Sequence, residues 1–100
     1  MATINLELQH SLTEQEALKR IKKLSTEIQD QYGDKMSEVN ESWKGNKGAF
    51  SFSTKGYNIS GTIEVKKYTI LIHGDIPWSL GLFKGKIEKT IRDRAQILLQ

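Results

Sequence analysis

The sequence contains no cysteine, a single proline and no long apolar run. The absence of cysteine excludes disulfide bonds, thiolate zinc sites, iron–sulfur clusters and thiol nucleophiles. Because the apolar runs are only a few residues long, we predict no segment that spans a membrane. The opening MATINLELQH lacks the basic and apolar regions of a signal peptide, which favours the cytoplasm. A chain of 100 residues is typical of one domain, which we expect to cover residues 1–100.

The charge is distributed unevenly along the chain. Residues 1–43 hold 5 Lys or Arg against 8 Asp or Glu (net −3), and residues 44–100 hold 10 against 4 (net +6). A basic half is compatible with an anionic partner and equally with a solvated helix face. Residues 47–52, KGAFSF, are superficially similar to an RNA-recognition strand, but Ala49 and Ser51 stand where that motif has aromatic residues. We therefore do not expect nucleic acid as a partner.

Hydrophobic periodicity predicts the secondary structure. Strict alternation over residues 3–9 indicates a half-buried strand, and apolar residues at helical spacing predict a helix over 14–32, ended by Gly33. Four alternating segments follow, separated by short turns rich in glycine and lysine, which favours antiparallel pairing. A last helix is predicted from the only proline, Pro77, with Asp75 as its N-cap, to about Leu99.

This order of elements, β-α-β-β-β-β-α, predicts an α+β fold. We expect an antiparallel sheet of four to five strands with both helices packed on one face, resembling a reduced helix-grip fold.

The beginning of the last helix carries apolar residues on two sides. On a helical wheel, a core-facing arc contains Leu80, Phe83, Ile87, Ile91 and Leu98. Trp78 and Leu82 fall on the opposite side, which would make them an exposed apolar anchor. Flanking cations are supplied by Lys84, Lys86 and Lys89. The alternative is that residues 76–79 are not helical and Trp78 turns inward.

Few residues point to catalysis or to a metal. His10 and His73 lie near strand ends and could approach each other, but no third ligand stands at a metal-binding spacing. Glu41 shares a strand face with Trp43, so an enzyme would require these two histidines and Glu41 to converge in one pocket. We therefore expect no enzyme activity, no metal and no cofactor.

Residues 80–88, LGLFKGKIE, resemble the Leu-Gly-x-Phe-Lys-x-x-Ile-Glu signature of the polyhydroxyalkanoic acid system family. The segment 10–17 is similar to the start of that family, and residues 52–61 resemble its Phe-x-x-Ser-Gly-Val-x-Gly segment with a one-residue shift. The likeness covers nearly the whole chain, although residues 75–78, DIPW, replace an apolar pair that the family commonly carries. The resemblance implies a cytoplasmic protein linked to storage granules, and it supplies no catalytic residue.

Two functions follow as hypotheses. The first is a non-enzymatic protein that binds a hydrophobic granule surface or a granule-bound protein through Trp78, Leu82 and the neighbouring lysines. The second is a small carrier that holds an apolar ligand between the sheet and the last helix. The residues that could open such a cavity are Gly61, Gly81, Gly85 and Phe83.

Overall fold

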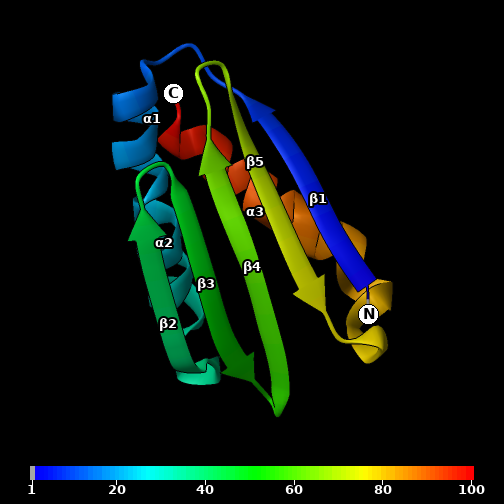
Figure 1. Cartoon of the computed structure of the whole chain (residues 1–100). Helices are drawn as coiled ribbons and strands as arrows, with labels where there is room; N and C mark the ends of the chain where they lie inside the picture. Colours follow the sequence, from blue (N-terminus) through cyan, green and yellow to red (C-terminus); the bar gives the residue numbers. More distant parts are fainter. Residues whose placement is uncertain (1) are drawn as a thin grey trace.

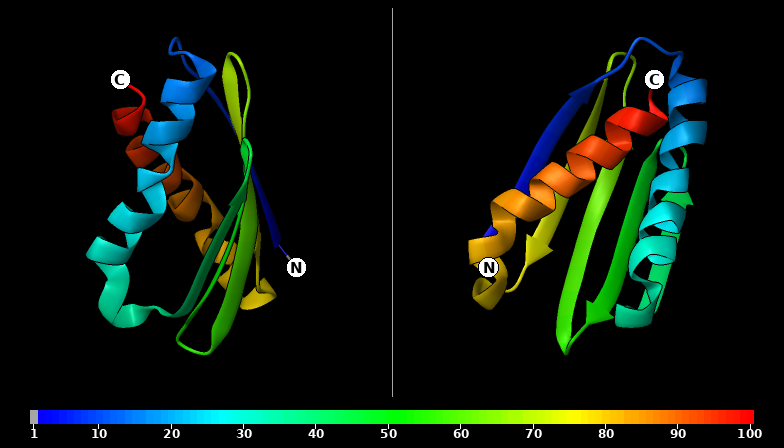
Figure 2. Two further views of the ribbon diagram at one scale, coloured as in Figure 1. Left: turned by 60° about the vertical axis from the view of Figure 1, so that its left-hand side comes forward. Right: turned by 180° about the vertical axis from the view of Figure 1, so that it is seen from behind.

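The computed structural model describes residues 2–100, apart from the side chains of residues 31 and 32, and contains one five-stranded antiparallel sheet (Figure 1). Its strands are β1 (Ala2–Gln9), β2 (Ser37–Lys44), β3 (Lys47–Thr54), β4 (Tyr57–Val65) and β5 (Thr69–Ile76). Their spatial order is β1-β5-β4-β3-β2, so β2 to β5 form a meander and β1 lies beside β5. The helical segment that precedes the meander and the helix that follows it cover the same face of the sheet (Figure 2). This confirms the predicted α+β fold and element order.

Strand alternation decides which residues reach the core. In β1, Ile4, Leu6 and Leu8 are buried beneath the helices, and the residues between them face the opposite, open side of the sheet. Ile70 and Ile72 of β5 lie opposite Leu8 and Leu6 in the antiparallel register. Each row of buried side chains therefore continues across neighbouring strands, as the period-2 pattern predicts.

The first helical segment begins as the sequence predicts. The Thr13 hydroxyl accepts a hydrogen bond from the Glu16 backbone N–H at 3.1 Å, which caps α1 (Glu14–Ile21). The helix predicted over 14–32 is divided at Lys22, after which α2 (Lys23–Tyr32) begins. The helix ends at Tyr32 with Gly33 as its C-cap, as predicted, and Gly33 has right-handed geometry and opens a short 3-10 turn, η1 (Gly33–Lys35).

Arg20 joins this helix to the end of the last one. Its guanidinium bonds the Glu16 carboxylate at 3.0 Å and also donates to the backbone carbonyl of Gln100. The hydrogen bond from Arg20 lowers the pKa of Glu16 from its ordinary value. The stability that this carboxylate contributes is therefore present above its unfolded-state pKa and is lost as pH falls through the lowered folded-state pKa.

The last helix begins later than predicted. Asp75 and Ile76 are the final residues of β5, and Pro77 is extended (φ −60°, ψ 152°), so Asp75 is not an N-cap. A 3-10 helix, η2 (Trp78–Phe83), follows Pro77. Phe83 has non-helical dihedral angles (φ −98°, ψ 3°), and α3 (Lys84–Leu98) begins directly after it. Proline restricts the residue before it to extended geometry, which keeps Ile76 in the strand.

The core lies between the sheet and the three helices α1, α2 and α3. Its buried side chains come from every element except β2, β3 and the short helices: Ile4, Leu6, Leu8, Ala17, Ile21, Leu24, Ile63, Val65, Ile70, Ile72, Ile76, Ala95 and Leu99. Several aromatic and aliphatic side chains are half-buried at its border, among them Trp43, Phe50 and Leu80. Leu99, directly after α3, is buried as well, because the end of the helix lies against the core.

Candidate functional site

Three large apolar side chains are exposed on one short segment. In η2, the exposed fraction is 80% for Trp78, 95% for Leu82 and 54% for Phe83. We call these three residues the η2 apolar cluster. Exposed single apolar residues are ordinary on protein surfaces, but three within six residues of chain form a feature that folding does not require.

The local sequence explains why these side chains face solvent. Pro77 ends β5, and the Leu80 N–H then bonds the Pro77 carbonyl at 3.0 Å in a 3-10 turn. Because a 3-10 helix has three residues per turn, a wheel drawn at 3.6 residues per turn misplaces Phe83, although it places Trp78 and Leu82 correctly on the exposed side. Leu80 is the residue of this segment that packs against the core.

This geometry decides between the two sequence interpretations of the segment. Trp78 is not turned inward, although residues 76–79 are indeed not α-helical. Phe83 was predicted in the core-facing arc, and that prediction is wrong because Phe83 lies at the junction of η2 and α3 and is half exposed. The exposed apolar segment therefore includes Phe83 in addition to the two residues, Trp78 and Leu82, that the sequence indicated.

The lysines beside the cluster differ in their pairing. Lys84 lies 3.8 Å from Glu88, and Lys89 lies 2.7 Å from Asp93, each pair spaced four residues apart on α3. Lys86 is exposed and has no ion-pair partner within residues 2–100. The positive charge next to the cluster is therefore partly compensated, and Lys86 is its uncompensated member.

The four residues proposed to line a ligand cavity do not gather around one. A Cβ added at Gly61 would lie 2.3 Å from the His73 carbonyl oxygen, so close packing explains this glycine. Nothing lies within 4 Å of a Cβ added at Gly85. A Cβ added at Gly81 would have one neighbour within that distance, the Ala2 Cβ at 3.9 Å. Gly61 is part of the lining of a hollow on the sheet, but neither this hollow nor a smaller one beside Trp43 is lined by Gly81, Gly85 or Phe83.

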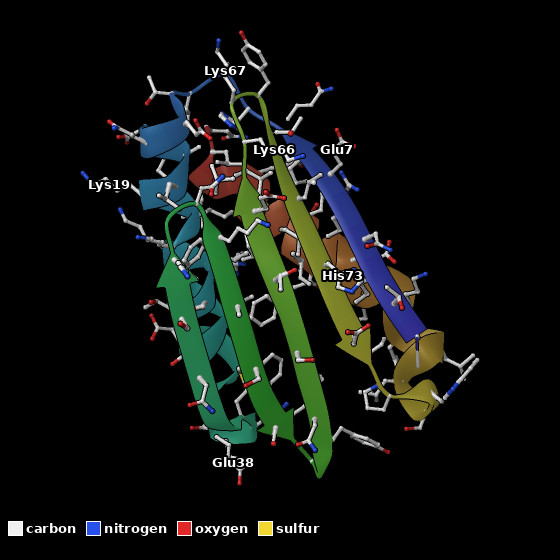
Figure 3. All side chains as sticks on the ribbon, viewed as in Figure 1. Glu7, Lys19, Glu38, Lys66, Lys67 and His73 are labelled. Carbon is white, nitrogen blue, oxygen red and sulfur yellow. The ribbon has the colours of Figure 1, made fainter. Side chains whose placement is uncertain are left out.

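The histidines and Glu41 serve separate local contacts. A ring nitrogen of His10, Nε2, lies 2.9 Å from the Lys66 carbonyl, and Nδ1 accepts the Leu12 N–H at 3.2 Å. His73 lies on the open face between β5 and β1 (Figure 3). Glu41 accepts the Trp43 indole N–H at 3.1 Å near the β2 edge. Glu41 and His73 both line the hollow on the open face of the sheet, but His10 is not part of its lining, so the three do not converge in one pocket.

The open face of the sheet contains a hollow that the sequence did not predict. Its volume is about 490 Å³, and small or polar side chains from four strands line most of it: Asn40, Ser42, Ala49, Ser51, Ser60, Thr62, His73 and Asp75. His73 Nδ1 lies 2.8 Å from Asn5 Oδ1, and its Nε2 lies 3.6 Å from Asp75 Oδ1. No sequence motif joins these residues, because strand pairing alone brings them together.

Two features that residues 2–100 lack bear on the class of site. No group of three or more histidine, cysteine or acidic side chains in this part of the chain could hold a metal ion. None of the described helices is long and apolar enough to cross a bilayer. The exposed η2 apolar cluster and the hollow on the open face are thus the two surface features that stand out.

Comparison with known proteins identifies the family. No curated protein and no solved structure matches the chain. A family model described as polyhydroxyalkanoic acid system protein matches residues 4–99, which is nearly the whole chain and includes the η2 apolar cluster. This description names a cellular system and states no reaction or ligand. The chain therefore belongs to the polyhydroxyalkanoic acid system protein family.

Proposed function

We propose that the protein is a non-enzymatic cytoplasmic protein that attaches to polyhydroxyalkanoate granules, at their hydrophobic surface or through a granule-bound protein. The contact is made by the η2 apolar cluster, with Lys84, Lys86 and Lys89 at its border. The observation that carries this proposal is the exposure of Trp78 and Leu82, which are 80% and 95% accessible. Family membership supports the link to the polyester system.

The physical argument starts from the exposed area. Burying a large apolar side chain contributes roughly 1.5–3 kcal/mol. Trp78 and Leu82 together would then contribute about 3–6 kcal/mol on binding, before the loss of rotational freedom is subtracted. Tryptophan and lysine side by side suit a boundary between an apolar phase and water, because both side chains combine an apolar body with a polar end.

The first test is partitioning of the purified protein onto protein-free polyhydroxyalkanoate particles. We expect the double variant Trp78→Ala/Leu82→Ala to bind about 100-fold more weakly than the wild type, which corresponds to a loss of about 3 kcal/mol. Both side chains project into solvent, so the circular dichroism spectrum and melting temperature should stay close to those of the wild type.

A matched control uses two other exposed apolar residues. Tyr68 (66% exposed) lies in the turn between β4 and β5, and Ile97 (58% exposed) lies in the last turn of α3. Both of these segments are at the opposite end of the molecule from η2 (Figure 1). The variant Tyr68→Ala/Ile97→Ala should bind the particles as the wild type does. Equal binding by all three proteins would refute the anchor. Binding to native granules but not to bare polyester would assign the contact to a granule-bound protein.

A further inference from the structure

The outer side of β1 is an unpaired strand edge. The His10 N–H bonds the Tyr68 carbonyl at 2.9 Å, and the antiparallel register with β5 runs on without a break from Gln9↔Thr69 to Ala2↔Ile76. Bonded and non-bonded residue pairs alternate in such a ladder. The even-numbered residues of β1 therefore direct their N–H and C=O groups toward β5. Those of Thr3, Asn5, Glu7 and Gln9 point away from the sheet.

The two edges of the sheet differ in how they are protected. In β2 the register shifts between Ser37 and Asn40, and Glu38 adopts a positive φ of 53°. Such a bulge interrupts pairing with a further strand. β1 has no bulge and no proline, and Glu7 is its single charged residue. In Figure 1, no other strand lies along its outer side. A regular edge of eight residues with so little protection is a template for strand addition.

We propose that the outer edge of β1 pairs with β1 of a second copy of this chain, antiparallel, so that two five-stranded sheets join into one. The pairing is centred on Leu6, which faces Leu6 of the second copy. Asn5 then lies opposite Glu7 of that copy, and Thr3 lies opposite Gln9. With their symmetry equivalents these pairs form about eight backbone hydrogen bonds.

The side chains on the open face fit this register. Asn5 Oδ1 is already occupied by His73 Nδ1 at 2.8 Å, so Nδ2 is the amide atom that has no partner within residues 2–100. Glu7 also has no hydrogen bond or ion pair within those residues, and Figure 3 shows it on the outer side of β1. A free amide donor and a free carboxylate acceptor therefore face each other twice across the two-fold axis.

Neighbouring registers are less favourable. A shift of one residue toward Glu7 as the centre would place the two Glu7 carboxylates directly opposite each other, which is destabilising. A shift toward Asn5 as the centre would leave Gln9 beyond the paired region and would lose part of the ladder. The register centred on Leu6 gives the longest ladder of the three and places no like charges opposite each other.

The test is the oligomeric state of two variants with opposite charge at one position. In analytical ultracentrifugation, the mass of the purified chain should rise from 11.4 kDa toward twice that value as the concentration is raised to about 500 µM. At this concentration a dimer with a Kd of about 100 µM is still detected. Asn5→Glu places two pairs of carboxylates opposite each other and should raise the Kd at least about ten-fold. Asn5→Lys places a cation opposite each Glu7 and should lower the Kd.

Three further variants keep the result decisive. Glu7→Pro removes an outward N–H without removing a bond to β5, so it should abolish dimers and leave a folded monomer. Ser42→Glu on the β2 edge should leave the Kd unchanged. A wild type that stays monomeric at every concentration overturns the proposal. So does a dimer that Asn5→Glu leaves intact and Trp78→Ala/Leu82→Ala dissociates, because the η2 apolar cluster would then be the interface.

Discussion

Replacing Gly61 with alanine should lower the free energy of unfolding by about 3 kcal/mol. A Cβ at this position would lie 2.3 Å from the His73 carbonyl oxygen, 2.7 Å from Cζ of Phe50 and 3.2 Å from the Gly74 Cα. Two of these three atoms belong to the backbone of β5 and cannot move without disturbing its ladder with β4. In a domain of this size, 3 kcal/mol corresponds to a fall in melting temperature of roughly 12–24 °C.

Gly85→Ala is the matched comparison for this prediction. A Cβ there meets nothing within 4 Å, and Gly85 lies in the first turn of α3 with no positive φ. Alanine should therefore stabilise the protein by about 0.5–1 kcal/mol, because it favours helix and restricts the unfolded chain. Thermal unfolding followed by circular dichroism measures both changes. A Gly61→Ala protein that melts with the wild type would contradict the close approach of β4 and β5.

These two glycines have different surroundings that the sequence alone does not predict. The sequence suggests both as residues that could open a ligand cavity. The structure assigns close packing to Gly61, since Phe50 and the β5 backbone fill the space above it, but not to Gly85. Sequence periodicity could place Gly61 on the inner face of a strand, whereas its contacts depend on which residues the partner strands set opposite.

The strands were predictable because their pattern is local. Alternation in β1, β4 and β5 indicated the buried face, and short turns between β2 and β5 indicated antiparallel neighbours. The position of β1 beside β5 depends on long-range pairing, which no local pattern contains. The hollow on the open face was missed for the same reason, since its lining comes from four strands.

The candidate site was predicted in part. Trp78 and Leu82 were recognised as outward-facing, but on the assumption of a continuous α-helix. The chain instead forms a 3-10 segment after Pro77, which also exposes Phe83. The apolar spacing of Leu80, Phe83 and Ile87 fits a helical stripe well, so the pattern alone could not reveal that the backbone changes geometry at Phe83.

Replacing Ile70 with alanine should lower the free energy of unfolding by about 3.5 kcal/mol. Ile70 is completely buried in β5, and the register places it between Leu8 of β1 and Val65 of β4, which are buried as well. Neighbouring strands on both sides prevent the backbone from closing around the missing side chain, so a cavity remains. The loss is a large part of the roughly 5–15 kcal/mol that stabilises a typical domain.

The next residue along the strand provides the control for Ile70. Leu71 points to the open face, where its cross-strand neighbours are Glu7 and Glu64 rather than core residues. Leu71→Ala should therefore change stability by less than about 1 kcal/mol. Urea unfolding followed by circular dichroism should shift the midpoint strongly for Ile70→Ala and little for Leu71→Ala, with the slope unchanged. Equal losses at both positions would mean that the open face is covered in solution. The pairing proposed for β1 would not produce that result, because it extends the sheet in its own plane and leaves both faces as they are.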